Sequence, residues 1–357
     1  SLRHRRRVWD ASCSGRFENA PGAPSQEPAF SMEHDLAGSL LIGDIGGTNA
    51  RFALATESGF ANAVTLCCAD FASADDAIRQ YLHDVSADSP AVICLAAAGP
   101  VVQNQVRITN NHWTLNADQI GKDFGIEKVR LMNDFEAAAH SILQLGDDDY
   151  QAIGLPDAKP LLDDRFNIAI VGPGTGFGAA GLVRRDQMVI PIVGEGGHVG
   201  FAPRTQLQVE MLKVLRGKFD RVFIDRLVSG PGIENIYWAL AQIHGEPRTQ
   251  SSARDIFNNS ADDSDPRARE SMLMFFELLG QVAGDFALTL GAVDGVYIAG
   301  GIAKRYPEQL KNSGFRSAFE DKGSHRAYME KIPTLLITND EPGLLGAAYC
   351  ALALSSS

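Results

Sequence analysis

Two segments of this chain share one pattern: a buried strand, a glycine-rich turn and a second strand. They read LLIGDIGGTNARFAL from residue 40 and IAIVGPGTGFGAAGL from residue 168. Apolar runs bounded by glycine turns predict strands. Glycines let a backbone approach another group closely and expose its N–H donors. Because sequence identity between the two segments is slight, an internal repeat is a hypothesis at this point.

Both turns offer donors suited to a phosphate. Thr48 and Thr175 add hydroxyls to the glycine N–H groups, and Asp44 can hold Mg²⁺ through water, because Mg²⁺ keeps several waters and takes few carboxylates. Two such turns facing each other would clamp a triphosphate from both sides. The alternative is a pair of tight hairpins with structural glycines, but two turns at matching places favour phosphate binding.

Other nucleotide-binding motifs fit poorly. The P-loop pattern G-x-x-x-x-G-K-[ST] and the protein kinase motifs are absent. A relaxed dinucleotide fingerprint does match at Gly174, Gly176 and Ala179, with Glu195 further on. That motif needs a helix after the loop, whereas residues 179–192 read as two strands.

Composition excludes several classes of protein. The net charge is −12 over 357 residues, which disfavours a nucleic-acid binder or a membrane-surface protein. No run of 18 apolar residues exists, so no transmembrane helix is expected. The five cysteines show no C-x-x-C and no Cys/His ligand spacing, so neither a zinc site nor a disulfide framework is indicated.

The remaining pattern alternates strands and helices. We expect strands at 39–43, 51–55, 64–68, 91–98, 128–132, 166–171, 179–183, 188–193, 295–299 and 331–338. We expect helices at 73–85, 135–145, 208–219, 234–244, 266–290 and 342–354.

Asn133 and Asp134 follow a predicted strand directly and precede a predicted helix. Ligands of open α/β sheets collect at such strand ends. A carboxylate beside an amide can orient and deprotonate a hydroxyl. The alternative is that Asp134 only caps the next helix.

Four further stretches are candidates for binding. Glu195-Gly-Gly-His198 can present two polar groups to one small ligand, or can be a surface turn with a solvated histidine. The cluster TNNHW at 109–113 has the composition of many carbohydrate sites, or is an ordinary Asn-rich turn. Asp225 precedes the helix-opening turn SGPG. Gly300 and Gly301 end a strand and would let a flat base or ribose lie close to the backbone.

Within the N-terminal extension, residues 1–38, the first 31 residues differ from the rest of the chain. These 31 residues hold five arginines and three acids, lack an apolar signal region and include PGAPSQEP. We expect a disordered extension, either a remnant of cloning or an upstream translated segment, with a targeting segment as the alternative.

Taken together, the motifs resemble the bacterial-type glucokinases, the non-zinc group within the actin/hexokinase-like ATPases. The motifs that carry the resemblance span about residues 39–357 in matching order: GDIGGTNARFAL, TNNHW, NDFEAA, GPGTGFG, GEGGHVGFAP, SGPG, IAGGI, SGFRSAFEDKG and PGLLGAA. The related repressor-type sugar kinases typically carry a cysteine-rich zinc motif, which this chain lacks.

The resemblance implies an α/β, two-domain actin-like ATPase (ribonuclease H-like) fold with mixed sheets and an interdomain cleft. The small domain would be 39–144 plus 339–357, and the large domain 145–338. It also implies a cytoplasmic homodimer that phosphorylates glucose at its 6-hydroxyl with MgATP, the first step of glycolysis, without nucleic-acid or membrane partners.

The resemblance also assigns roles to residues. Asp134 would be the general base, beside Asn133. The sugar would contact Glu195, His198, Asn110, Asn111 and Asp225, where the family commonly has Glu. The nucleotide would meet Asp44, which takes Mg²⁺, and Gly46, Gly47, Thr48, Asn49, Gly174, Thr175, Gly176, Gly300 and Gly301.

Three alternatives remain open at this level. The hexose could be mannose or fructose, because a single hydroxyl contact decides that choice. An actin-like ATPase would need no sugar, which would leave GEGGH and NNHW without a role. A sugar-binding regulator would need a DNA-binding helix-turn-helix, and residues 1–38 are too short and irregular for one.

Overall fold

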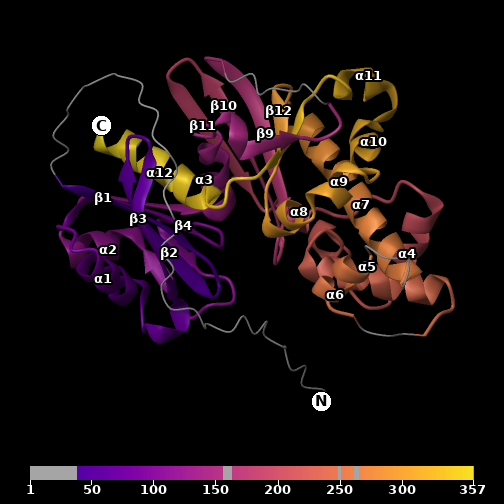
Figure 1. Cartoon of the computed structure of the whole chain (residues 1–357), viewed down its shortest axis with the longest axis horizontal. Coiled ribbons are helices and arrows are strands. Elements are labelled where there is room, and N and C mark those ends of the chain that lie inside the picture. Colours follow the sequence, from indigo (N-terminus) through magenta and orange to yellow (C-terminus); the bar gives the residue numbers. More distant parts are fainter. Residues whose placement is uncertain (1–37, 156–162, 248–250, 261–264, 357) are drawn as a thin grey trace. The chain divides into compact units, whose positions relative to one another are not determined.

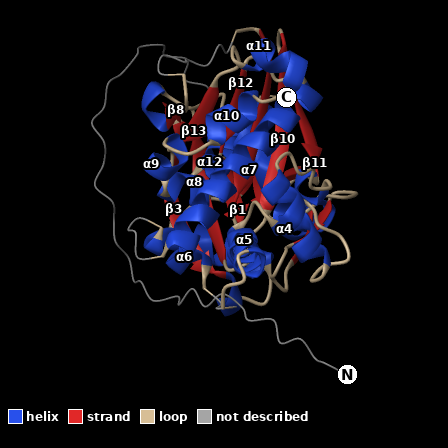
Figure 2. Ribbon diagram, turned by 90° about the vertical axis from the view of Figure 1, so that its right-hand side faces the viewer, coloured by secondary structure: helices blue, strands red, loops and turns tan. Residues whose placement is uncertain are grey.

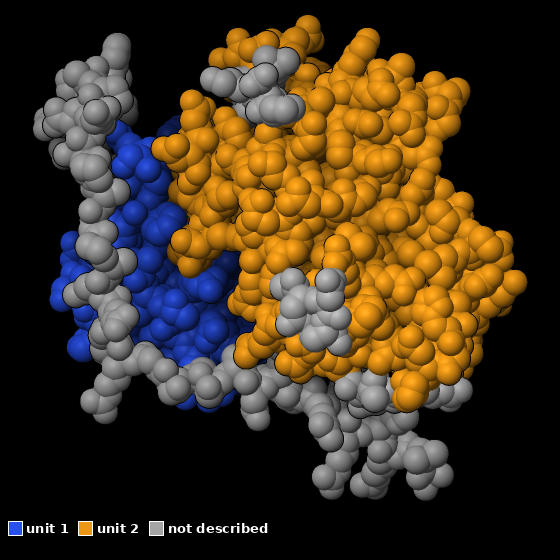
Figure 3. All heavy atoms as spheres, turned by 45° about the vertical axis from the view of Figure 1, so that its right-hand side comes forward, with its two compact units in different colours: residues 1–131, 351–357 blue, residues 132–350 orange. Residues whose placement is uncertain are grey.

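The computed structural model describes residues 38–155, 163–247, 251–260 and 265–356. Contacts divide the chain into two compact units (Figure 3): unit 1 is residues 1–131 and 351–357, and unit 2 is residues 132–350. The predicted domain limits at 144/145 and 338/339 stay a prediction. Most of the extension predicted at 1–38 lies outside the described residues.

The five-stranded sheet of unit 1 has the order β3-β2-β1-β4-β7. Its central strand β1 is antiparallel to β2 and parallel to β4. The strands are β1 (Ser39–Ile45), β2 (Asn49–Thr56), β3 (Gly59–Cys67), β4 (Pro90–Ala97) and β7 (Lys128–Asn133), with the hairpin β5 (Gln105–Arg107) and β6 (Thr114–Asn116). The helices of this part of the chain are α1 (Ala74–Asp84) and α2 (Ala117–Phe124).

The six-stranded sheet of unit 2 has the order β11-β10-β9-β12-β13-β8. Its strands are β8 (Tyr150–Ala152), β9 (Arg165–Pro173), β10 (Phe177–Arg185), β11 (Met188–Gly194), β12 (Gly295–Ile298) and β13 (Thr334–Ile337). Its larger helices are α3 (Asp134–Ser141), α4 (Gln206–Arg216), α5 (Gly230–Ile243), α6 (Ala253–Asn259), α7 (Pro266–Leu290) and α12 (Pro342–Ser355), which ends in unit 1. Shorter ones are α8 (Gly301–Arg305), α9 (Pro307–Lys311), α10 (Phe315–Glu320) and α11 (Arg326–Met329).

The two sheets repeat one topology, which confirms the internal repeat. Like β1, strand β9 is antiparallel to its chain successor β10 and parallel to the later strand β12. Equivalent backbone bonds extend the parallel pairs, from Ala98 N to Ile45 O (2.9 Å) and from Ala299 N to Val171 O (2.8 Å). A strand and not a helix follows the second glycine loop, so the dinucleotide fingerprint is wrong.

Strand alternation gives the unit 2 sheet two apolar faces. Ala169 and Val171 face a core built largely from α5, α6 and α7 (Figure 2). Ile168 and Ile170 face α3 on the other side. Helix α12 packs closely on α3 (Figure 1), because a Cβ on Gly346 would lie 1.7 Å from Ala137 O.

Helix α7 agrees with the prediction at both ends. Asp265 caps it, Pro266 opens it, and Gly291 closes it with a left-handed φ of 62°. It is long and apolar enough to cross a membrane, but 61% of its most apolar stretch is buried in the protein. Burial of this kind is typical of a core helix.

Several predicted elements differ from the structure in extent, and some observed elements were not predicted. Helix α3 ends at Ser141 rather than Leu145. The strand predicted at 331–338 is only Thr334–Ile337. The hairpin β5–β6 and helix α2 were not predicted. The strands of the hairpin are only three residues long each, whereas α2 carries end signals that were missed, the N-cap Asn116 and the left-handed Gly125.

Candidate active site

The first glycine turn joins β1 to β2 through residues 46–49. Gly46 N donates to Asn49 O over 2.9 Å, and Thr48 is exposed. A Cβ on Gly47 would lie 2.9 Å from Thr109 O, so close approach of another backbone requires glycine there. Asn111 Nδ2 donates to Gly46 O over 3.3 Å. The TNNHW segment therefore supports this turn.

Within that segment the residues divide by role. Asn110 is exposed with a left-handed φ of 60°, a conformation that Asn tolerates well. Asn111 is engaged at both ends of its amide, since its Oδ1 accepts from Trp113 N. Trp113 itself is only 2% exposed and belongs to the core, so the aromatic ring of the cluster does not offer a sugar platform.

Asp44 lies in β1 directly opposite Arg51 of β2. Its carboxylate Oδ2 is 3.8 Å from Arg51 Nη1, and 24% of its side chain remains exposed. Burial raises the pKa of Asp44 above its ordinary 3.8, and the Arg51 charge opposes that rise.

Among the described residues, no group of three His, Cys, Asp or Glu side chains could enclose a metal ion. A single, mostly buried carboxylate beside a phosphate-type turn fits a Mg²⁺ ion that keeps most of its waters. Asp44 would be the protein group that holds it.

The second glycine loop, residues 172–178, consists of the end of β9, the connecting residues 174–176 and the start of β10. At its tip Gly174 N donates to Gly176 O over 2.7 Å, and Thr175 is exposed. Two further elements hold the loop: Gly230 N, at the start of α5, donates to Gly174 O over 2.9 Å, and Phe177 N donates to Asp225 Oδ1 over 2.6 Å.

Asp134 is the first residue of α3, and Asn133 is its N-cap. Asn133 Oδ1 accepts from Phe135 N over 2.9 Å, so the capping role considered for Asp134 belongs to Asn133. Asp134 is half-buried, and its Oδ1 also lies 2.9 Å from Phe135 N. A carboxylate at a helix N-terminus is stabilised in its charged form.

The Asp134 segment and the second glycine loop lie against each other. A Cβ on Gly178 would lie only 1.9 Å from Phe135 Cε2. The aromatic ring that follows Asp134 therefore occupies the space that a side chain at position 178 would need. This packing positions the candidate base relative to the candidate phosphate loop inside one unit.

The Glu195–His198 segment follows β11 and lies over the start of β10. A Cβ on Gly197 would lie 2.4 Å from Phe177 O, and one on Gly196 would lie 2.5 Å from Phe286 Cζ. The glycines are buried, while the Glu195 and His198 side chains are 59% and 66% exposed, with Oε2 and Nδ1 3.9 Å apart. The Glu195 and His198 side chains therefore face outward, while the buried glycines between them hold the backbone in place.

His198 is more than a solvated surface residue. Its ring stacks on Phe223, with ring centroids 4.9 Å apart and an interplanar angle of 25°. Phe223 was not predicted, and its sequence context carried no signal for this role. Phe135 and Phe177 belong to the motifs NDFEAA and GPGTGFG. The contact of Phe135 with Gly178 and that of Phe177 with Gly197 could not be deduced from the adjacent residues, because the partners are far apart in the sequence.

Gly300 and Gly301 follow β12. Gly300 has a φ of 92°, which favours glycine, and a Cβ there would lie 2.4 Å from Pro173 O. Gly301 opens α8 and has open space where a Cβ would be. This junction therefore adjoins the second glycine loop and leaves room above Gly301.

Each unit thus gathers its own share of the predicted residues. Unit 2 brings together the second loop, Asp225, the Glu195–His198 segment, the start of α3 and Gly300. Unit 1 brings together the first turn, Asp44 and Asn111.

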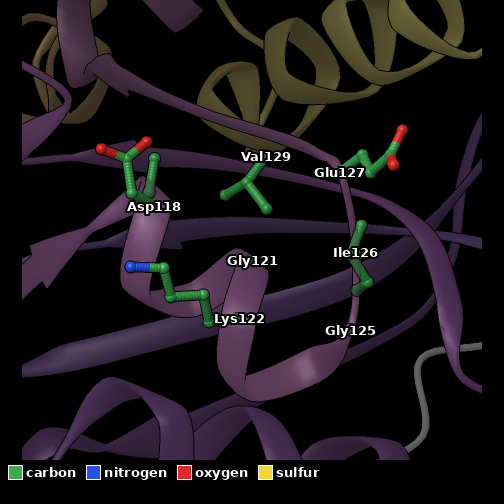
Figure 4. A pocket seen from close by; sticks show the side chains of 8 residues that line it. Asp118, Gly121, Lys122, Gly125, Ile126, Glu127 and Val129 are labelled. Atoms are coloured by element: carbon green, nitrogen blue, oxygen red, sulfur yellow. The ribbon is translucent and has the colours of Figure 1, made fainter.

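Two pockets of about 360 and 310 Å³ in the described part of unit 1 involve none of the predicted residues. The larger of the two is lined by Asp118 and Lys122 of α2 and by Glu127 (Figure 4).

Comparison with known proteins identifies the family. The chain matches the family model described as Glucokinase over residues 41–354. It is 41% identical to the glucokinase of Chromohalobacter salexigens over 309 residues, covering 86% of this chain and 95% of that protein. The structure of a glucokinase from an Antarctic psychrotroph superposes with a TM-score of 0.81 at 36% identity, covering 88% of this chain and 99% of that one.

A more distant structure supports the fold alone. A ROK family glucokinase from Streptomyces griseus, in complex with glucose and AMPPNP, has a TM-score of 0.59 at 19% identity and covers 88% of this chain and all of its own. These neighbours have the actin-like ATPase fold, as the motifs predicted. The chain belongs to the glucokinase family.

Proposed function

We propose that this protein transfers the γ-phosphoryl group of ATP to the 6-hydroxyl of D-glucose, giving glucose 6-phosphate and ADP. The observation that carries the proposal is the packing of Phe135, the residue after Asp134, on Gly178 of the second glycine loop. A base and a phosphate-binding loop held together in this way suit phosphoryl transfer to a hydroxyl. Family membership supports the same reaction.

Asp134 accepts the proton of the 6-hydroxyl as the oxygen attacks phosphorus. Asn133 is held by its capping bond and fixes the start of α3. Because phosphoryl transfer depends mainly on positioning and charge stabilisation, backbone N–H groups and threonine hydroxyls can do much of the work. Gly47, Thr48 and Asn49 supply them in unit 1, and Thr175 and Gly176 in unit 2. Gly46 and Gly174 shape these turns instead of donating, because their N–H groups already bond to Asn49 O and Gly176 O.

Charge neutralisation also calls for a divalent cation. Mg²⁺ bound at Asp44 would supply positive charge to the phosphates when ATP is present. The adenosine lies over Gly301, where the structure leaves open space.

Glu195 and His198 bind sugar hydroxyls, supported by their exposed and fixed side chains. Asn110 and Asn111 belong to the same sugar-binding set from unit 1. Asp225 can join this set through acceptor sites that the bond from Phe177 N to Oδ1 leaves open. We also propose that the enzyme acts in the cytoplasm as a homodimer, which light scattering on the purified protein would test.

The test is ADP release from MgATP with no sugar, glucose, mannose, fructose or glucosamine. We expect release that depends on glucose, with glucose 6-phosphate as product. Asp134→Ala should lower kcat by at least ~10², because a general base contributes about that much or more. The exposed acid Asp220 provides a control, since Asp220→Asn changes a charge outside the proposed site.

The outcomes separate the alternatives. Equal ADP release without sugar would indicate an ATPase. Preference for another hexose would revise the sugar and keep the reaction. An Asp134→Ala enzyme with unchanged kcat would disprove the assignment of the base.

A further inference from the structure

A single turn in unit 2 touches both the sugar segment and the second glycine loop. This is the 3₁₀ turn Ile224–Arg226, with Phe223 just before it. Phe223 stacks on His198, and Asp225 accepts a hydrogen bond from Phe177 N. Neither contact is local, since Asp225 and Phe177 are 48 residues apart.

The Asp225 carboxylate fits tightly against the loop. Its Oδ1 is 2.6 Å from Phe177 N, a short bond between an amide and a carboxylate. A Cβ on Gly176 would lie 2.8 Å from the same oxygen, and one on Gly197 would lie 3.5 Å from Asp225 Cβ. The carboxylate can take this place because Gly176 lacks a side chain.

The turn itself is anchored from several sides. Ser229 Oγ donates to Asp225 O over 2.6 Å, and Asn235 Nδ2 donates to Arg226 O over 2.9 Å. The Arg226 guanidinium lies over the rings of Phe219 and Phe223, at 4.4 and 4.9 Å from their centroids. The carboxylate of Asp225 is therefore presented from a fixed backbone.

We propose that Asp225 is a positioning residue that holds the second glycine loop in its nucleotide-binding shape. Without its acceptor, Phe177 N loses its bond and the limb of the loop between Gly176 and Gly178 loses its anchor. The affinity for the phosphates of a nucleotide then falls even when no sugar is present. This inference rests on the proposed function and gives Asp225 a role that the sugar contact does not include.

The experiment measures the dissociation constant of ADP, with Mg²⁺ and without sugar, by calorimetry on the full chain. Asp225→Ala removes the acceptor and should weaken ADP binding about tenfold or more. Asp225→Asn keeps the size but loses the charge, and should weaken it by a smaller factor. The KM for ATP should rise more than the KM for glucose in both variants. Asp220→Asn is the matched control and should bind ADP like the unaltered protein.

Other results would overturn the proposal. Unchanged ADP binding in both variants, with a raised KM for glucose, would make Asp225 a sugar contact only. If Asp225→Ala does not fold, judged by its melting curve, Asp225→Asn decides alone. Absence of glucose-dependent ADP release by the unaltered protein would refute the proposed function, while the ADP titrations would still judge Asp225. Absence of any ADP binding by the unaltered protein would refute both.

Discussion

The two glycine turns occupy equivalent places in the two sheets but are built differently. In unit 1 the ladder ends at the pair Ile45–Ala50, and residues 46–49 close a tight turn. In unit 2 the equivalent pair is Val171–Ala179, and the ladder continues through Gly172–Gly178 and Pro173–Phe177 before it turns. The second turn is therefore a longer hairpin that extends past its sheet.

Their supports differ accordingly. The first turn is held by neutral groups of unit 1, Asn111 Nδ2 and the Cys68 thiol, which both donate to Gly46 O. The second is held by a carboxylate, by the start of α5 and by close backbone contacts with Ala299 and Gly300. The same strand–turn–strand pattern is thus supported by different groups in the two units.

The largest expected contrast concerns the glycines under each turn. A Cβ on Gly172 would lie 2.4 Å from the backbone atom Ala299 O, whereas one on Gly43 would meet the side-chain atom Leu95 Cδ2 at 2.7 Å. Side chains can move more easily than a sheet backbone. Gly172→Ala should lower the free energy of unfolding by about 3 kcal/mol and Gly43→Ala by about 1 kcal/mol, measured by denaturant titration.

Gly194 provides the control for this pair. Nothing lies within 4 Å of a Cβ at that position, so Gly194→Ala should be nearly neutral. If Gly172→Ala and Gly43→Ala lowered the free energy of unfolding equally, the surroundings of the two turns would be equally rigid.

Two buried tyrosines, one in each unit, provide a second comparison, for which we expect smaller changes in the free energy of unfolding. Tyr81 Oη in unit 1 donates to Asn62 O over 3.0 Å, whereas Tyr297 Oη in unit 2 is buried with no hydrogen-bond partner among the described residues. Tyr81→Phe should cost about 1 kcal/mol of unfolding free energy, because a hydrogen bond is lost. Tyr297→Phe should be neutral or slightly stabilising, because an unsatisfied hydroxyl is removed. A loss at Tyr297 as large as that at Tyr81 would reveal a partner for its hydroxyl.

The smallest expected effect concerns how the free energy of unfolding depends on pH. A carboxylate in unit 1 and one in unit 2 contribute to it with opposite signs. The hydrogen bond from Arg204 holds the pKa of Asp321 in unit 2 below 3.8, so its stabilisation is present at neutral pH and is lost as pH falls through the folded-state pKa. Burial raises the pKa of Asp44 in unit 1, so its charged form is unfavourable at neutral pH and that cost disappears on acidification.

Asparagine variants isolate the two contributions. Asp321→Asn should destabilise at neutral pH by about 1 kcal/mol or less, since the pair is partly exposed, and the deficit should shrink below pH 3.8. Asp44→Asn should instead stabilise at neutral pH, with an advantage that narrows as pH falls toward the folded-state pKa. Denaturant titrations at several pH values measure the free energy of unfolding of both variants. If both substitutions changed it in the same direction at neutral pH, the opposite pKa shifts assigned to Asp321 and Asp44 would be wrong.

Local signals predicted much of the fold. The ends of α7 agree with the prediction, and Asp265, Pro266 and Gly291 are residue types that mark helix ends in a sequence. The paired strand–turn–strand segments predicted the repeated topology. The end of α3 and the hairpin β5–β6 were missed, because no cap or strong periodicity marks them.

The candidate site divides in the same way. The sequence alone determined which residue types are present at the strand ends: glycines and threonines in the turns, Asn133 and Asp134 before a helix, Glu195 and His198 around two glycines. Only the tertiary structure decided what supports them, such as Phe223 under His198, Phe135 against Gly178 and Asp225 on Phe177. The physical reason is that periodicity and capping act within a few residues, whereas these contacts join segments tens of residues apart after the sheets have formed.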